Sequence, residues 1–207
     1  MENTFELLQS ILDSIDNPDQ EVLALSMNDV HYEKMFSLVV RGNEFGRLTR
    51  VFIAGKKLKP YGVQLHTHRY PVRITMIKGN IMHHVAKIKP LHECNLIMPL
   101  YNYKSYLNGG SGLNYVGMKN VNINSYSLPV GSTFKMNSNE FHTMSCSKGS
   151  IWIVEELGFN REDSLVLGVP FTPDNLYTKP SMFQINDRAQ TVHREIMKII
   201  NSFNNIK

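Results

Sequence analysis

Two histidines lie one residue apart in His66-Thr67-His68, and six of the chain's eight histidines fall between His66 and His142. Side chains at positions i and i+2 of a β-strand point to the same side, so a strand there presents both imidazoles to one point. Neutral imidazole is a ligand for iron, zinc, copper, nickel and manganese. The pair therefore indicates metal chelation, and metal-free structural histidines are the alternative.

Two glycines extend this pattern. Gly79 follows His68 by eleven residues, and Gly131 precedes His142 by eleven residues. This spacing resembles the two motifs of the cupin superfamily, in which an HxH pair and a hairpin glycine are followed by a second glycine and a single histidine. The resemblance covers roughly residues 62–156 and implies that His142 is the third ligand.

The resemblance has departures in both motifs. The glutamate usual in the first motif would fall at Val72 or Arg73, and neither is a carboxylate. In the second motif Asn137, Asn139 and Cys146 stand where proline, glycine and asparagine are usual. The common site of three histidines and one glutamate is therefore not expected.

A site of three histidines is expected in its place, formed by His66, His68 and His142. That set is similar to the thiol dioxygenases of the cupin superfamily, which hold Fe(II) by three neutral histidines and leave positions open for substrate and oxygen. The resemblance favours Fe(II), with Zn, Ni or Mn as alternatives. Three neutral ligands leave the metal more positive, which favours an anionic co-ligand such as a thiolate.

Strand alternation gives candidates for substrate contacts around the first motif. Gln64 shares the face of His66 and His68. Arg73 stands beside the position of the missing glutamate, and an inward arginine would bind a carboxylate or phosphate. His83 and His84 are adjacent, so only one of them faces the interior, and we take His84 as the pocket candidate.

The second motif and the strand after it give further candidates. Met144 and Cys146 point inward if His142 does. Around Trp152, one strand face carries Trp152, Val154 and Glu156 and the other carries Ile151, Ile153 and Glu155. We expect Trp152 to contact substrate, and the glutamate on the inner face, Glu155 or Glu156, can complete a metal shell or act as an acid–base group.

The elements that would position these residues are mostly strands. Short runs rich in β-branched and aromatic residues, separated by Gly, Pro and Asn, indicate an antiparallel sandwich or barrel. The predicted strands are Phe36–Arg41, Leu48–Ala54, Gly62–Thr67, Val72–Ile77, Asn80–Ile88, Tyr115–Met118, Asn122–Ser127, Ser132–Met136, Thr143–Cys146 and Ile151–Glu155. Helical spacing of apolar residues predicts helices over Thr4–Asp16 and Asp187–Phe203.

The predicted fold is all-β, a cupin-like double-stranded β-helix, or jelly-roll barrel, with short N-terminal and C-terminal α-helices. We expect one domain over residues 1–207. Residues 1–35 form a helical extension, residues 36–170 the barrel with an insertion at about 90–112, and residues 171–207 a wrapping coil and the C-terminal helix. Tyrosines crowd the insertion and its end, and they form either a lid or a small satellite core: Tyr101, Tyr103, Tyr106 and Tyr115.

Composition limits the function classes. The chain has 207 residues, 42% of them hydrophobic, and a formal charge of 22 − 18 = +4, without a basic block of the kind that binds nucleic acid. Its two cysteines make no disulfide framework, its N-terminus is acidic, and its apolar runs are too short to cross a membrane. We expect a cytoplasmic homodimer that binds a small molecule and neither membrane nor nucleic acid, with Phe36–Arg41 as an edge strand.

These features favour a metal-binding cupin protein, most specifically a non-haem Fe(II)-dependent oxygenase acting on a small polar substrate held in the barrel. One alternative is a sugar or keto-acid isomerase or epimerase of cupin type, in which a histidine and a glutamate move the protons. Another is a non-catalytic cupin that binds a small ligand or a protein, because one fold hosts enzymes and binders alike.

Overall fold

β-strands form most of the regular structure in the computed structural model, which describes residues 4–30, 35–42, 47–60, 64–93, 96–104, 112–158, 161–168 and 186–204. The strands in chain order are β1 (Met27–Val30), β2 (Met35–Gly42), β3 (Leu48–Ala54), β4 (Leu65–His66), β5 (Val72–Lys78), β6 (Ile81–Ile88), β7 (Leu96–Lys104), β8 (Gly112–Leu128), β9 (Thr133–Met136), β10 (Phe141–Cys146), β11 (Ile151–Glu156) and β12 (Ser164–Leu167). The helices are α1 (Thr4–Asp16), α2 (Gln20–Leu23), a short 3₁₀ turn (Leu91–Glu93) and α3 (Asn186–Asn204).

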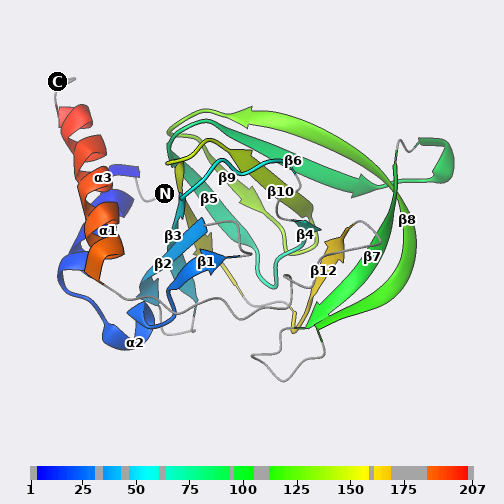
Figure 1. Cartoon of the computed structure of the whole chain (residues 1–207), viewed down its shortest axis with the longest axis horizontal. Helices are drawn as coiled ribbons and strands as arrows, with labels where there is room; N and C mark the ends of the chain where they lie inside the picture. The colour runs from blue at the N-terminus through cyan, green and yellow to red at the C-terminus, as the bar shows by residue number, and fades with distance from the viewer. Residues whose placement is uncertain are drawn as a thin grey trace.

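The strands form two antiparallel sheets that face each other (Figure 1). The first has the order β1-β2-β3-β11-β5-β9. The second has the order β10-β4-β12-β7-β8-β6 and closes on itself, because β10 pairs with both β4 and β6.

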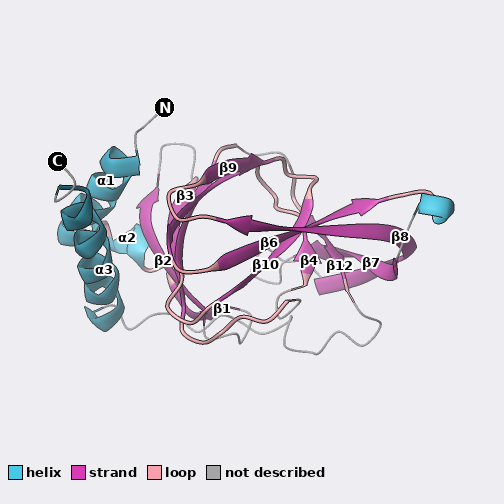
Figure 2. Cartoon of the chain, turned by 90° about the horizontal axis from the view of Figure 1, so that it is seen from above, coloured by secondary structure: helices cyan, strands magenta, loops and turns pink. Residues whose placement is uncertain are grey.

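The outer face of the first sheet is covered by α1 and α3 (Figure 2). Alternation along β11 places Ile151 and Ile153 on this face, where they are almost fully buried. The helices bring one apolar stripe each, including Leu8 of α1 and Ile196 of α3, both 0% exposed. This packing buries one side of the sheet and leaves its other side for the interior.

The opposite face of the same sheet lines the space between the two sheets. Trp152 and Val154 of β11 point there, together with Phe52 of β3 and Ile74 of β5. The inner core is therefore built from the residues that alternate with those beneath the helices. Several of these inner-core residues also form the walls of the candidate site.

The fold is all-β, a cupin-like jelly roll with terminal helices, as the sequence predicts. Helix α1 and strand β3 have the predicted bounds, and Gly79 and Gly131 both have positive φ, at 94° and 85°. Gly79 makes the turn between β5 and β6, and Gly131 the turn before β9. Such backbone favours glycine, which explains the glycine of each motif.

The second sheet differs from expectation. The stretch expected as an insertion at about 90–112 contains β7, which pairs with both β8 and β12. The two predicted strands Tyr115–Met118 and Asn122–Ser127 are parts of the single long strand β8. The register between β7 and β8 shifts by a bulge opposite Leu100 and Tyr101 of β7, and such a bulge bends the strand. Strand β7 was not predicted because it contains Pro99, and a proline within a run argues against a strand.

The edge of the first sheet also differs. Strand β2, which contains Phe36–Arg41, is covered by β1 and is not an edge. Several other expectations fall on residues outside the described ranges: Gly62, Cys94, Tyr106 and the coil 171–183. Among the described helices, none is long and apolar enough to cross a membrane.

Candidate metal centre

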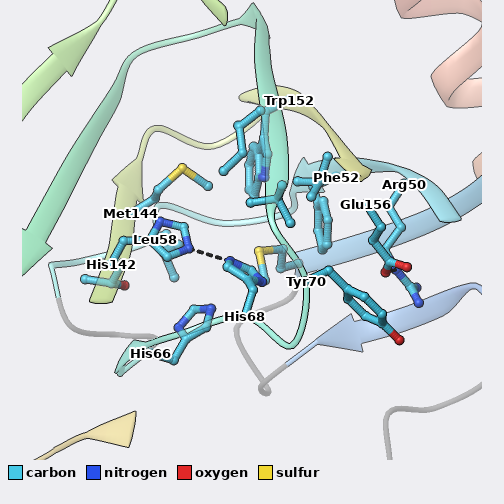
Figure 3. Close-up of a pocket in the computed structure, with 15 residues that line it drawn as sticks. Arg50, Phe52, Leu58, His66, His68, Tyr70, His142, Met144, Trp152 and Glu156 are labelled. Atoms are coloured by element: carbon cyan, nitrogen blue, oxygen red, sulfur yellow. Dashed lines mark hydrogen bonds and ion pairs between the residues drawn. The ribbon is translucent and has the colours of Figure 1, made fainter. Parts of the chain in front are cut away.

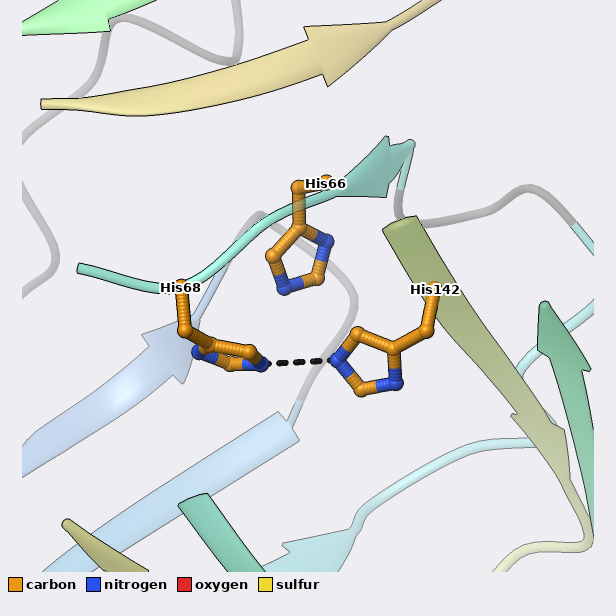
Figure 4. Close-up of side chains that lie close together, drawn as sticks. All are labelled: His66, His68 and His142. Atoms are coloured by element: carbon orange, nitrogen blue, oxygen red, sulfur yellow. Dashed lines mark hydrogen bonds between the residues drawn. The ribbon is translucent and has the colours of Figure 1, made fainter. Parts of the chain in front are cut away.

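The three histidines of the sequence pattern meet at the junction of β4 and β10 (Figure 4). His66 ends β4, His68 follows two residues later, and His142 lies near the start of β10. In the antiparallel pair of β4 and β10, His142 is in register with His66. The strand pairing thus brings together residues that are 76 positions apart.

Their nitrogen atoms have the spacing of a ligand set. One ring nitrogen from each histidine lies within 4.8 Å of those of the others, and the Nε2 atoms of His68 and His142 are 2.7 Å apart. Two nitrogens bound to one ion at about 2.0–2.1 Å are typically about 3 Å apart. Among the described residues this is the one cluster of His, Cys, Asp or Glu with such spacing. The donor set fits a divalent transition metal.

A backbone contact orients His66. Its Nδ1 lies 2.8 Å from the carbonyl oxygen of Gln64, and a carbonyl can only accept, so Nδ1 carries the proton. The lone pair of this neutral imidazole is then on Nε2, the atom that remains for a ligand bond. Hydrogen bonds of this kind fix the tautomer and the ring orientation of metal-binding histidines.

His83 contacts His142 at the ring nitrogen that does not face His68. Its Nε2 lies 3.0 Å from Nδ1 of His142, and both side chains are buried. His83 also packs on Phe134, with ring centroids 4.7 Å apart. If His142 binds a metal through Nε2, its Nδ1–H donates to His83, which then occupies the position of an outer hydrogen-bond partner.

Burial keeps these imidazoles neutral. Loss of solvation lowers the pKa of His66, lowers that of His68 to about 3, and lowers that of His142 well below the ordinary value. Repulsion between the histidines adds to the effect at His68 and His142. At neutral pH all three are in the form that binds metals.

A cavity of about 270 Å³ adjoins the histidines (Figure 3). Its walls are mainly apolar and come from the inner faces of both sheets. Phe52 and Trp152 form one wall as a parallel stack, with centroids 5.4 Å apart and planes 6° apart. Met144 of β10 forms part of another. A mostly apolar cavity with a few converging polar groups is the usual form of a small-molecule site.

The end of this cavity away from the histidines is polar, as Figure 3 shows. Arg50 of β3 and Glu156 of β11 form an ion pair there, with Nε and Oε1 3.7 Å apart. Their side chains are 19% and 12% exposed. Burial raises the pKa of Glu156 and lowers that of Arg50, and the attraction between the two groups opposes both shifts.

A second cavity, of about 250 Å³, also adjoins His66 and His68. It shares His66, His68, Tyr70 and Glu156 with the first cavity. Its lining also includes the polar side chains of Gln64, Arg69, Tyr103 and Ser164.

Some of the predicted substrate-contacting residues lie at these cavities. Met144 and Trp152 line the first, and Gln64 lines the second. Of the two candidate glutamates, Glu156 lines both, whereas Glu155 lies on the opposite face of β11. Tyr103 reaches the second cavity, and Tyr101 and Tyr115 pack against each other with centroids 5.7 Å apart.

Three predicted contacts lie elsewhere. Arg73 points to the outer face, where its Nε and Nη2 donate to Glu155 at 2.6 and 2.5 Å, because the two residues are opposite each other on β5 and β11. His84 faces away from His142 and bonds the hydroxyls of Ser125 and Ser145 at 2.7 and 2.9 Å.

Cys146 is the third. It is 5% exposed and belongs to the apolar core beside Leu58, whose backbone it pairs with, and burial raises the pKa of its thiol. Cys146 lies on the same face of β10 as His142 and Met144. It is four residues beyond His142, however, and does not line the cavity. His92 and Glu93, the other neighbouring pair of possible metal ligands in this part of the chain, lie on the surface, and the His92 side chain is 80% exposed.

Sequence reasoning did not single out Arg50, Phe52 or Tyr70, which line the first cavity. Arg50 and Phe52 alternate with the buried residues Thr49 and Val51 along β3, so they share the other face of the strand, and an arginine beside an aromatic residue on that face was the available signal.

No family model matches this chain, and no curated protein does. Solved structures give partial alignments. One is hydroxypropylphosphonic acid epoxidase from S. wedmorenis, with 11% identity, 64% of this chain and 54% of that chain covered, and a TM-score of 0.39. Another is hydroquinone 1,2-dioxygenase from Sphingomonas sp. TTNP3 with 4-hydroxybenzoate bound, with 11% identity, 64% and 70% covered, and a TM-score of 0.38.

A structure of FeII HppE aligns at 12% identity over 68% of this chain and 57% of that chain, with a TM-score of 0.40. This chain thus spans little more than half of the epoxidase chains. Since TM-scores below 0.5 do not establish a relationship, the class of protein rests on its own strand topology and histidine cluster. These define an antiparallel jelly roll with a candidate three-histidine metal centre.

Proposed function

We propose that the protein is a metal-dependent, cupin-type oxygenase that holds Fe(II) through His66, His68 and His142 and acts on a small molecule in the adjoining cavity. The observation that carries the proposal is the convergence of three neutral imidazoles at one end of an apolar cavity. Zn, Ni and Mn are the other metals that this donor set fits.

Ferrous iron would supply the one-electron chemistry that reaction with dioxygen requires. The protein would hold the metal and orient the histidines that bind it. The Gln64 carbonyl fixes the tautomer of His66, and β10 holds His142 in register with it. Three neutral ligands would leave a bound metal its full positive charge, which would favour an anionic substrate atom, and substrate or water would supply its remaining ligands.

The apolar walls serve a second purpose. Trp152 and Met144 limit the water around the histidines and hold a substrate beside them, which replaces a random encounter by a positioned one. The charged pair Arg50–Glu156 lies at the far end and does not belong to the ligand set.

Oxygen uptake tests this function. Protein loaded with Fe(II) under anaerobic conditions is exposed to dioxygen with small thiols, alcohols and phenols in turn. We expect substrate-dependent uptake by the wild type and none by His142→Ala loaded in the same way. Uptake equal to that of free Fe(II) for every compound would contradict the proposal.

One observation favours a second candidate. Glu156 lines the same cavity as the histidines, and burial raises the pKa of its carboxyl, so a histidine and a glutamate lie ready for proton transfer. An isomerase or epimerase of this kind would exchange substrate protons with solvent without oxygen. Solvent deuterium incorporation that persists in chelated protein would favour it.

A further inference from the structure

The far end of the cavity carries a compensated pair of charges. Besides its contact with Arg50, Glu156 accepts the backbone N–H of Leu48 at 3.1 Å through Oε2. Arg50 also reaches the hydroxyl of Ser37, with its Nη1 3.5 Å from Oγ. One anion and one cation thus lie together, little exposed, where the end of a bound molecule would meet them.

This pairing decides what charge a ligand can carry at that end. A ligand carboxylate would come beside Glu156 as well as Arg50, and like charges in a poorly solvated site repel strongly. A ligand cation would meet the same difficulty with Arg50. An uncharged group that both donates and accepts a hydrogen bond matches both partners, and a hydroxyl is the smallest such group.

The walls decide the shape of the rest of the ligand. The Phe52–Trp152 stack presents flat aromatic surfaces, and Val154 and Ile74 lie beside it. Such walls suit a planar or short apolar body. The volume of about 270 Å³ suits a body the size of a single ring or a chain of comparable length.

From these contacts we infer that the substrate is a small amphipathic molecule whose end away from the histidines is an uncharged, hydroxyl-type group that contacts Arg50 and Glu156, while its apolar body lies on the Phe52–Trp152 stack. The inference rests on the proposed function, because the other end of the molecule meets the histidine centre. It excludes organic acids whose carboxylate would enter the Arg50 end.

Arg69 is the other cation near this end. It lines the second cavity, where its guanidinium lies 5.6 Å from the centre of the Tyr70 ring. Its charge stabilises the Glu156 carboxylate from that side. Arg50 and Arg69 thus both act on Glu156 against the effect of burial, which raises the pKa of its carboxyl.

The protein carries its own probe of this cavity. Trp152 is the single tryptophan of the chain and lines the wall. Its fluorescence can be titrated in metal-free protein with three molecules of nearly equal size: benzyl alcohol, benzoate and benzylammonium. We expect benzyl alcohol to bind at least tenfold more tightly than either charged compound.

A charge change at Glu156 tests the cause. In Glu156→Gln the cation of Arg50 is no longer compensated, so we expect benzoate to gain about tenfold or more in affinity. The matched control is Glu155→Gln, which removes the same charge from the neighbouring residue on the outer face of the same strand. That variant should keep the wild-type order.

The outcomes separate this inference from the proposed function. Benzoate binding the wild type most tightly, no response to any of the three compounds, or equal effects of the two glutamine variants would each overturn the inference. None of these concerns the metal, whose content is measured independently in the same preparations. If the protein holds no metal but shows the expected order, the proposed function fails and the ligand class stands.

Discussion

At the scale of single residues, the hydrogen bond between His83 and His142 gives the sharpest prediction. His83→Leu removes the acceptor for Nδ1–H of His142, so we expect metal affinity to fall about 10–100-fold, the usual cost of losing such a partner. His83→Gln keeps an acceptor oxygen and should retain most of the affinity. Competition with a chromophoric chelator measures both.

The neighbouring histidine supplies the control. His84 is equally buried but faces Ser125 and Ser145 on the other side of β6, so His84→Leu should leave metal affinity unchanged. Equal losses in His83→Leu and His84→Leu would mean that general damage to β6, and not the contact with His142, determines the affinity.

Arg73 gives a second prediction at this scale, because the sequence placed it near an anionic substrate and the structure pairs it with Glu155. Arg73→Met leaves a carboxylate that is 5% exposed without its bidentate partner. We expect a loss of about 1–3 kcal/mol in the free energy of unfolding, measured by urea denaturation. Binding of benzyl alcohol and of metal should not change; a changed ligand affinity at full stability would argue that Arg73 acts in the site.

At the scale of elements, the two motif glycines make a matched pair. A Cβ at Gly79 would lie 2.3 Å from Oγ of Ser150 and 2.8 Å from its Cα, whereas at Gly131 nothing lies within 4 Å. Both have positive φ, so each alanine variant carries the strain of that backbone, about 1–2 kcal/mol. Gly79→Ala adds a clash with backbone, and we expect about 3 kcal/mol or more by thermal or urea unfolding. Equal costs in the two variants would contradict this account of the turn.

Elements with strong local patterns could be predicted from the sequence, and those fixed by tertiary pairing could not. The apolar stripe of α1 and the β-branched run of β3 are local signals, and both have the predicted bounds. Strand β7 contains a proline and many polar residues, and it exists because β8 and β12 pair with it on either side. Propensity alone does not carry such information.

At the scale of the whole molecule, buried neutral histidines link folding to pH. Burial, with repulsion from neighbouring histidines, lowers the pKa of His68 to about 3 and that of His83 to about 4. The unfolded chain titrates near pH 6.5, so between about pH 6.5 and 4 it binds more protons than the folded protein does. Stability therefore falls as the pH falls, by up to about 1.4 kcal/mol per pH unit for each such histidine.

Urea denaturation of metal-free protein at pH 7, 5.5 and 4.5 checks this sign. His83→Gln should flatten the dependence, whereas His92→Gln, at a side chain that is 80% exposed, should leave it unchanged. A stability that is constant or rises toward pH 4.5 would show that these imidazoles are not kept neutral by the fold.

The candidate site combines both kinds of information. His66 and His68 were indicated by their i, i+2 spacing, although β4 ends at His66, and His142 was implied by the resemblance to the cupin motifs. The lining of the cavity was not predicted, because Arg50, Tyr70 and Glu156 come from separate parts of the chain and meet only when β3 and β5 pair with β11 on either side. The side of β6 that His83 occupies depends on its register with β10, which a sequence pattern does not define.

The measurement that tests the central claim most directly is metal content by elemental analysis, on protein purified without chelator or nickel affinity. Wild type is compared with the His66→Ala/His142→Ala double variant, with folding of both checked by circular dichroism. We expect close to one equivalent of a transition metal, iron when it is supplied, in the wild type and almost none in the folded double variant. A wild type that takes up no metal under any loading condition, or a double variant that binds as much, would contradict the three-histidine centre.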